Sequence, residues 1–246
     1  MRAGADPAAP LGPTFAAALP GGSIVRAGTT TRAAGDLQID GPADVLAARR
    51  RAVVDRPWAW LRQAHGADVV TVTDGDVADG LARVVGAEAD ALVTTSAAVV
   101  LAVQTADCAP LALWSPEGVV AAVHAGWRGI EAGVVGAAVD AMRAAGASSV
   151  AGWLGPCIHA ECYEFGADDL ARLVDGLGPT VAGRTAAGRP ALDLPAAVVV
   201  AATRAGVERL DGDGGCTACD ADRWWSHRAR GDAARQATVV WREVPG

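Results

Sequence analysis

Residues 91–123 restrict the fold more than any other part of the sequence. They contain several short runs of Val, Ala and Leu, interrupted at residues 94–96, 107–108 and 115–118 by polar or turn-forming residues. Within each run the residues are apolar throughout instead of alternating with polar ones, which is typical of strands buried on both faces. The sequence therefore predicts a buried β-sheet core that is covered on both sides.

Helical patterns precede and follow these runs. A mixed α/β (α+β) fold is predicted, because the hydrophobic period changes several times along the chain. Expected helices cover residues 42–52, 131–145, 168–177 and 195–205, and further expected strands cover residues 67–72, 150–154 and 238–241.

A single domain is expected over residues 21–246. The chain has 246 residues, enough for one α/β core, and shows no repeat, low-complexity linker or charge block. Residues 1–20 look apolar, but Pro7, Pro10, Pro13 and Pro20 interrupt them, so no export signal is predicted. We expect this segment to be a disordered or loosely attached tail.

Charge and hydropathy exclude several classes of partner. The chain has 21 basic and 28 acidic residues, a net charge of -7 that argues against nucleic-acid or anionic-membrane binding. The longest uncharged apolar stretch, residues 91–106, is too short to span a bilayer. Five cysteines, an odd number, disfavour a secreted disulfide framework, so a cytoplasmic protein is expected. Lysine is absent, which excludes Schiff-base chemistry.

Three side chains with metal-ligating groups stand at the ends of apolar runs. His65, Cys108 and His124 are each flanked by small residues, which favours exposure to a cleft. Two imidazoles and one thiolate would form a His₂Cys site with a fourth position open for water or substrate. We expect Asp107 or a strand carbonyl to fix the imidazole tautomers.

Simpler interpretations stay open at this stage. A cysteine in an apolar stretch is usually a small buried hydrophobe, and a histidine beside glycine is usually a turn residue. Cys216 and Cys219 form the single C-x-x-C pair, which is half of a structural zinc site, a redox pair, or simply two reduced thiols in a turn. Cys157 and Cys162 bracket a loop with a histidine and a glutamate that could also line a cleft.

Longer motifs around these residues resemble the YfiH/YlmD family. The resemblance runs from about Thr29 to Val240. Members have been called polyphenol oxidases or laccase-domain proteins, and more recently purine nucleoside phosphorylases. The matching segments are residues 63–66, 89–94, 105–110 and 124–129, with further matches at 155–158, 162–164, 216–219 and 226–228.

The resemblance implies a fold, a metal and a reaction. The fold is a single mixed α/β domain with buried β-sheets covered by helices. His65, Cys108 and His124 would bind a catalytic zinc ion. The activity would be phosphorolysis of adenosine, inosine, guanosine and methylthioadenosine, with deamination of adenosine as a side activity. Departures lie in the N-terminal third, at residues 29–32 and 48–49, so the substrate range is the least secure inference.

Phosphate binding and deamination each require particular groups. A phosphate dianion prefers bidentate donors, and without lysine the expected ones are Arg32, Arg49 and Arg128. Zinc lowers the pKa of bound water to about 7, which would explain deamination. Cys108 would be a ligand instead of a free nucleophile, and the partners would be nucleosides and phosphate.

Two other activities remain as alternatives. A copper polyphenol oxidase of the multicopper type needs more than the four histidines present, and a lone blue-copper site usually adds a methionine, here only Met1 or Met142. Adventitious copper at the same soft ligands stays open. A Cys-dependent hydrolase acting on a cell-wall precursor would use Cys108 as nucleophile and His124 as base. A partner-binding protein with vestigial chemistry is a third alternative.

Overall fold

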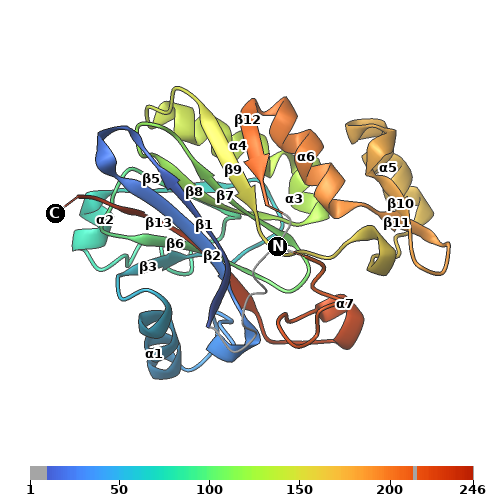
Figure 1. Ribbon diagram of the computed structural model, residues 1–246, viewed down its shortest axis with the longest axis horizontal. Coiled ribbons are helices and arrows are strands. Elements are labelled where there is room, and N and C mark those ends of the chain that lie inside the picture. The colour runs from blue at the N-terminus through green and yellow to red at the C-terminus, as the bar shows by residue number, and fades with distance from the viewer. Residues whose placement is uncertain (1–9, 213–214, 246) are drawn as a thin grey trace.

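Two large β-sheets form the centre of the protein (Figure 1). The computed structural model describes residues 10–212 and 215–245. Its strands are β1 (Leu11–Ala18), β2 (Ile24–Thr30), β3 (Trp58–Trp60), β4 (Val69–Val72), β5 (Ala91–Thr94), β6 (Val100–Thr105), β7 (Ala109–Trp114), β8 (Val120–Ala125), β9 (Val150–Leu154), β10 (Ala182–Arg184), β11 (Pro190–Leu192), β12 (Val207–Asp211) and β13 (Gln236–Glu243).

Both sheets mix parallel and antiparallel pairs. Within the described residues, one sheet has five strands in the order β1-β2-β13-β6-β3, and the other has six in the order β12-β9-β7-β8-β5-β4. Strand β13 is the last of the described strands in sequence, but it lies between β2 and β6, antiparallel to both. Strands β10 and β11 form a separate antiparallel pair.

Helices cover the outer faces of both sheets. In Figure 1, α3, α4 and α6 lie against the six-stranded sheet, whereas α1 lies beside the five-stranded one. This architecture confirms the predicted mixed α/β fold. The helices are α1 (Ala43–Val53), α2 (Asp74–Ala78), α3 (Trp127–Ala132), α4 (Val134–Ala144), α5 (Ala167–Leu177), α6 (Leu194–Arg204) and α7 (His227–Arg230).

The continuous apolar runs are explained by burial on both faces of each strand. In β6, Leu101 and Val103 pack into the core between the two sheets, whereas Val100 and Ala102 pack into the core on the side of α1. In β8, alternate residues likewise enter the core between the sheets and the core beneath α4. Neither face of these strands meets water, so no polar alternation appears in the sequence.

The helix predicted over residues 131–145 is in fact two helices. Gly133 separates α3 from α4 and has a φ of 90°, in the left-handed region. Glycine tolerates this conformation because it has no Cβ, and it commonly ends a helix. Helix α3 also begins earlier than predicted, at Trp127, with one residue between it and the end of strand β8.

The predicted N-terminal tail is wrong for part of its length. Residues 11–18 form β1, which pairs antiparallel with β2 at the edge of the five-stranded sheet. The register shifts between Leu11 and Thr14, around Pro13. Proline has no backbone N–H, and it is tolerated at such an edge because one side of an edge strand needs no donor. Residues 1–9 lie outside the described part of the chain.

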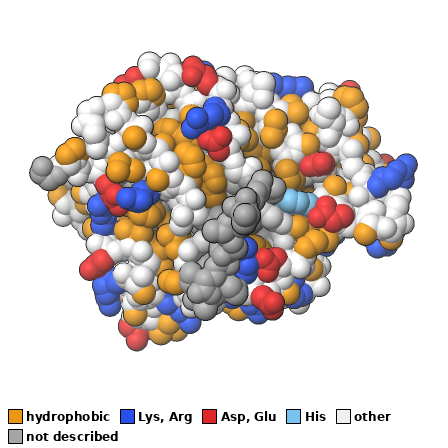
Figure 2. All heavy atoms as spheres, in the orientation of Figure 1, with side chains coloured by type: hydrophobic (Ala, Val, Ile, Leu, Met, Phe, Trp, Pro, Cys, Tyr) orange, Lys and Arg blue, Asp and Glu red, His pale blue; other side chains and the backbone are white. Residues whose placement is uncertain are grey.

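The surface bears charges of both signs. On the face shown in Figure 2, outside the grey atoms, arginines stand singly or beside acidic residues, without a continuous basic area. Among the described residues, no helix combines the length and apolar character needed to cross a bilayer.

Gly155 marks a point where the two sheets approach closely. A Cβ on Gly155 would lie 2.9 Å from Pro110 Cγ and 3.0 Å from Thr29 Oγ1. Pro110 belongs to the six-stranded sheet, whereas Thr29 belongs to the five-stranded one and shares a 2.6 Å hydrogen bond with Thr238. The glycine therefore permits the contact between sheets next to the loop that begins after β9.

Replacing Gly155 by alanine should destabilise the protein. The added methyl group overpacks the junction, which typically costs about 1–3 kcal/mol in the free energy of unfolding. Gly136→Ala is the control, because nothing lies within 4 Å of its Cβ position in helix α4, and there alanine should stabilise by about 0.5–1 kcal/mol. Urea denaturation measures both values. Equal stability of the two variants would show that the junction has room.

Candidate metal centre

His65, Cys108 and His124 converge from three separate parts of the chain. His65 lies in the loop after β3, Cys108 in the turn between β6 and β7, and His124 near the end of β8. One ligand atom from each lies within 4.8 Å of the others. Cys108 Sγ is 3.8 Å from His65 Nε2, and the two imidazole rings meet edge to face with centroids 4.8 Å apart.

The buried carboxylate of Asp90 positions both histidines. Its Oδ1 accepts hydrogen bonds from His124 Nδ1 at 2.8 Å and from the backbone N–H of His65 at 2.9 Å. Its Oδ2 accepts from the N–H groups of Ala64 and Gly66, at 3.2 and 2.7 Å. Because an ionised carboxylate only accepts hydrogen bonds, Nδ1 of His124 carries the proton and Nε2 is left for a metal ion.

Two further hydrogen bonds, both made by the Gln63 side chain, join the His65 loop to the end of β6. The Gln63 side chain donates to the carbonyl oxygen of Gln104 and accepts from its N–H, both at 2.7 Å. His65 itself has a φ of 60°. Such a conformation is uncommon for a residue other than glycine and persists only where surrounding contacts hold it. Gln63 and Asp90 supply those contacts.

Asp107 does not hold either imidazole, so that expectation is wrong. Its Oδ1 accepts from the Thr217 hydroxyl at 2.7 Å, and its Oδ2 accepts from the Arg228 N–H at 2.6 Å. These bonds hold a backbone with a φ of 98° immediately before Cys108. Asp107 therefore orients Cys108 through the main chain. The role expected of Asp107, fixing an imidazole tautomer, belongs to Asp90.

Gly126 leaves room beside the cluster. A Cβ at this position would lie 2.9 Å from His65 Cδ2 and 3.1 Å from Cys108 Sγ. Only glycine lets these two side chains approach the backbone that leads from β8 into α3. The Gly in the motif at residues 124–129 is thus explained by the packing of two neighbouring side chains.

The cluster has a polarised charge distribution. Burial raises the pKa of Cys108, but His124 and His65 lower it more, so that the result is about 6. Burial lowers the pKa of His124, whereas Cys108 and Asp90 raise it more, to about 9. A metal-free protein would thus hold a thiolate beside an imidazolium at neutral pH. One thiolate and two oriented imidazoles fit a borderline-soft divalent ion such as zinc.

A cavity of about 410 Å³ opens beside the three side chains. This volume is within the range of roughly 300–1,000 Å³ that is usual for small-molecule sites. Gln104 and Thr105 line it, and in the described part of the chain their buried Nε2 and Oγ1 atoms have no hydrogen-bond partner. Buried polar atoms of this kind cost free energy unless something binds them. The cavity therefore suits a polar ligand.

The three arginines expected to bind phosphate do not line this cavity. Among the described residues, the arginines lining the cavity include Arg62 and Arg235 but not Arg32, Arg49 or Arg128. Each of these three contacts another group: Arg32 lies over the ring of Trp225, Arg49 donates to the Asp36 carbonyl, and Arg128 lies over the ring of Trp127.

Several residues at the site were not predicted as site residues from the sequence. A signal existed for Asp90, because a lone acid directly before a buried strand must be paired to be tolerated. His227 lies in a matching segment, residues 226–228, but the places of the others depend on how distant strands meet. The unpredicted residues include Asp90, Gln104, His227 and Arg235.

Known proteins are similar to this chain over most of its length. Residues 27–243 match a family model described as multi-copper polyphenol oxidoreductase laccase. A purine nucleoside phosphorylase of Xylella fastidiosa is 36% identical over 187 residues, which cover 74% of this chain and 71% of that protein. Another, of Pseudomonas aeruginosa, is 33% identical over 241 residues, covering 90% and 95%.

Solved structures share the whole fold. A Neisseria meningitidis protein, NMB0706, superposes with a TM-score of 0.77 at 28% identity, covering 95% of this chain and 99% of that one. YlmD from Geobacillus stearothermophilus gives the same TM-score and identity over 89% and 92%. Fold and cluster together define a mixed α/β protein with a converged His₂Cys centre. The chain belongs to the YfiH/YlmD family.

Asp90→Asn should weaken metal binding. The amide would place an N–H against groups that themselves donate, and the tautomer of His124 would no longer be fixed. Loss of such a partner typically lowers metal affinity about 10–100-fold. Zinc titration against a chromophoric chelator measures the change. Asp140→Asn is the control, since that side chain is 78% exposed on α4; equal affinities of the two variants would contradict the role of Asp90.

The Cys108 thiol should react at a lower pH than an ordinary cysteine. With a pKa of about 6 it stays a thiolate above that pH and becomes protonated as the pH falls through it. Cys219 is the control: Cys162 lowers the pKa of Cys219, but burial and Cys216 raise it more. Iodoacetamide labelling at pH 7 in chelator, read by peptide mass spectrometry, should modify Cys108 first. Faster labelling of the more exposed Cys219 would refute this order.

Proposed function

We propose that the protein is a zinc-dependent purine nucleoside phosphorylase whose zinc is held by His65, Cys108 and His124. The observation that carries the proposal is the convergence of these side chains beside a polar cavity. The names of the relatives in Xylella and Pseudomonas support the reaction class. The same site would also deaminate adenosine.

The bound zinc would supply a Lewis acid and would lower the pKa of coordinated water. The chain's own residues do the rest. Asp90 keeps the proton on His124 Nδ1, so that the lone pair of Nε2 would be free to coordinate the metal. The His65 loop is fixed by Gln63, which keeps its imidazole beside Cys108. These contacts build the centre before any ligand arrives.

Gln104 and Thr105 would bind the nucleoside. Both residues line the cavity, and a rotation of each side chain would bring its buried, unpartnered Nε2 or Oγ1 to the purine or the ribose. Because few such groups line the cavity, they would discriminate only weakly between nucleosides. Inosine, guanosine and methylthioadenosine would therefore be accepted besides adenosine. Gln38 and Ile39 also line it, which brings the N-terminal third of the chain into the choice of substrate.

Arg235 is the arginine we assign to the phosphate. Arg62 also lines the cavity but pairs with Asp40 at 2.8 Å. Arg235 uses Nη1 for the carbonyls of the preceding loop, residues 232–234. Within the described residues its Nε and Nη2 have no partner, and these two parallel donors suit an oxyanion.

A copper oxidase activity is the rival that the family description favours. Multicopper chemistry needs many histidines, and this chain has four. A blue-copper site usually adds a weak methionine ligand, but Met142 is fully buried on the inner face of α4, in the core against the six-stranded sheet. The donor set therefore fits zinc better than either copper centre.

The decisive experiment measures the products made from a nucleoside panel. With phosphate, the parent protein should release free purine and ribose 1-phosphate, identified by mass. Chelator and Cys108→Ala should each abolish the reaction without unfolding the protein. Activity that survives chelation would favour a Cys-dependent hydrolase, and oxidation of phenols by protein containing copper would favour the oxidase.

Arg235→Ala should raise the KM for phosphate more than about tenfold. Truncating one partner of a desolvated charge pair typically costs about 2–5 kcal/mol of binding free energy. Adenosine deamination should be spared, because that reaction uses water instead of phosphate. Arg128→Ala is the matched comparison on an arginine outside the cavity lining. If Arg128→Ala raises this KM and Arg235→Ala does not, the phosphate role returns to Arg128.

A further inference from the structure

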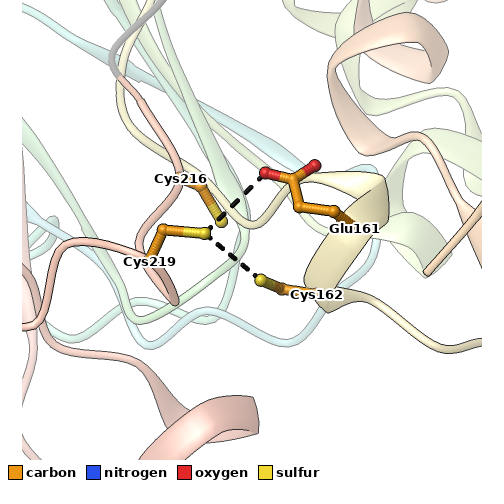
Figure 3. Close-up of side chains that lie close together, drawn as sticks. All are labelled: Glu161, Cys162, Cys216 and Cys219. Carbon is orange, nitrogen blue, oxygen red and sulfur yellow. Dashed lines mark hydrogen bonds between the residues drawn. The ribbon is translucent and has the colours of Figure 1, made fainter. Parts of the chain in front are cut away.

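A second cluster of metal-ligating side chains uses none of the residues described above as zinc ligands. It consists of Glu161, Cys162, Cys216 and Cys219, whose ligand atoms all lie within 4.8 Å of one another. Figure 3 shows the three sulfurs and the carboxylate pointing toward one another. The Cys162 and Cys219 sulfurs are 3.3 Å apart, and Cys219 Sγ is 3.8 Å from Glu161 Oε1.

The backbone already presents these side chains from two fixed turns. Glu161 and Cys162 belong to the short 3-10 helix Ala160–Cys162. Cys216 and Cys219 belong to a turn closed by a hydrogen bond from the Asp220 N–H to the Cys216 carbonyl, at 3.2 Å. The turns are joined where Cys216 pairs with Cys157 in a short parallel bridge. The sequence showed half of a zinc site, and the fold adds the other half.

Neighbouring groups offset the negative charge that three thiolates and a carboxylate would carry. The His159 N–H donates to Cys216 Sγ at 3.4 Å. The guanidinium of Arg230 donates to the carbonyls of Thr217 and Ala218, at 3.1 and 3.0 Å. These bonds fix the guanidinium, which also pairs with Asp232 at 3.1 Å, on the turn between the two cysteines. Hydrogen bonds and charges of this kind stabilise metal-bound thiolates.

We infer that Glu161, Cys162, Cys216 and Cys219 form a second zinc site with a structural role. Four protein ligands complete a tetrahedron and leave no open position for substrate, which distinguishes structural from catalytic zinc. Thiolates select zinc over magnesium or calcium, and the spacing of Cys216 and Cys219 is the one common in structural zinc sites. Each thiol that binds the ion loses its proton to solvent.

This second site would brace the first one. Thr217 lies between Cys216 and Cys219 in sequence, is fully buried, and donates to Asp107. Asp107 in turn precedes Cys108 and holds a positive φ. An ion that fixes the turn therefore fixes the hydroxyl that supports the catalytic cysteine. Loss of this ion should lower thermal stability and disturb the neighbouring centre.

Cobalt absorption can test the second site alone. Cys108→Ala removes the single thiolate of the first centre, so a thiolate-to-Co²⁺ charge-transfer band in this variant must come from the second cluster. Full-length Cys108→Ala protein, reduced and stripped of metal, is titrated with Co²⁺. We expect the band to grow to one Co²⁺ per chain, and added zinc to bleach it.

Further variants identify the ligands. Adding Cys162→Ser and Cys219→Ser should abolish the band, whereas adding Cys157→Ala, which changes a buried cysteine outside the cluster, should leave it intact. If the former protein does not fold, Cys219→Ser alone, at an exposed position, should weaken the band because one thiolate is lost.

Two outcomes of the cobalt titration would overturn the inference: no band in reduced Cys108→Ala protein, or a band that persists after the changes at residues 162 and 219. A disulfide between Cys162 and Cys219, seen by mass in protein purified with reductant, would also overturn it. The absorption readout does not involve nucleosides, so it stands or falls separately from the proposed phosphorylase activity.

Discussion

One buried carboxylate holds the candidate centre together. Burial raises the pKa of Asp90, but His124 and the backbone of Gly66 and His65 lower it more, so it remains ionised. Its own backbone takes part as well, because its carbonyl accepts from the N–H of His124 at 2.8 Å and its N–H donates to Asp68. Side chain and main chain of one residue thus connect β4, β5 and β8 to the loop that carries His65. A charge so placed is tolerated only when every partner is present.

The fold was predictable where burial leaves a strong pattern in the sequence. The runs that became β5 to β9 are apolar on both faces, and the structure buries both faces. Strand β1 escaped prediction because it lies at a sheet edge and contains Pro13. The break at Gly133 depends on a single φ value, which apolar periodicity does not encode.

At the site, the candidate metal ligands could be predicted from residue type, whereas the arginine that we assign to the phosphate could not. Few residue types bind metals, so the rare histidines and cysteines pointed to His65, Cys108 and His124, and the fold brings these three together. Arginines are common and long, and their ends are positioned by tertiary contacts such as the ring of Trp225 beneath Arg32. Sequence alone therefore could not separate an arginine that stacks on a ring from one that lines the cavity, such as Arg235.

The central place of β13 also constrains how the protein is made. Strands β2 and β6 each pair with β13 and not with one another. Until the ribosome has released residues 236–243, the five-stranded sheet is missing an interior strand, and two apolar strand edges stay unpaired. Such edges are prone to join other chains. The emerging polypeptide must therefore be kept from aggregating until residues 236–243 have left the ribosome, and only then can the two sheets close on each other.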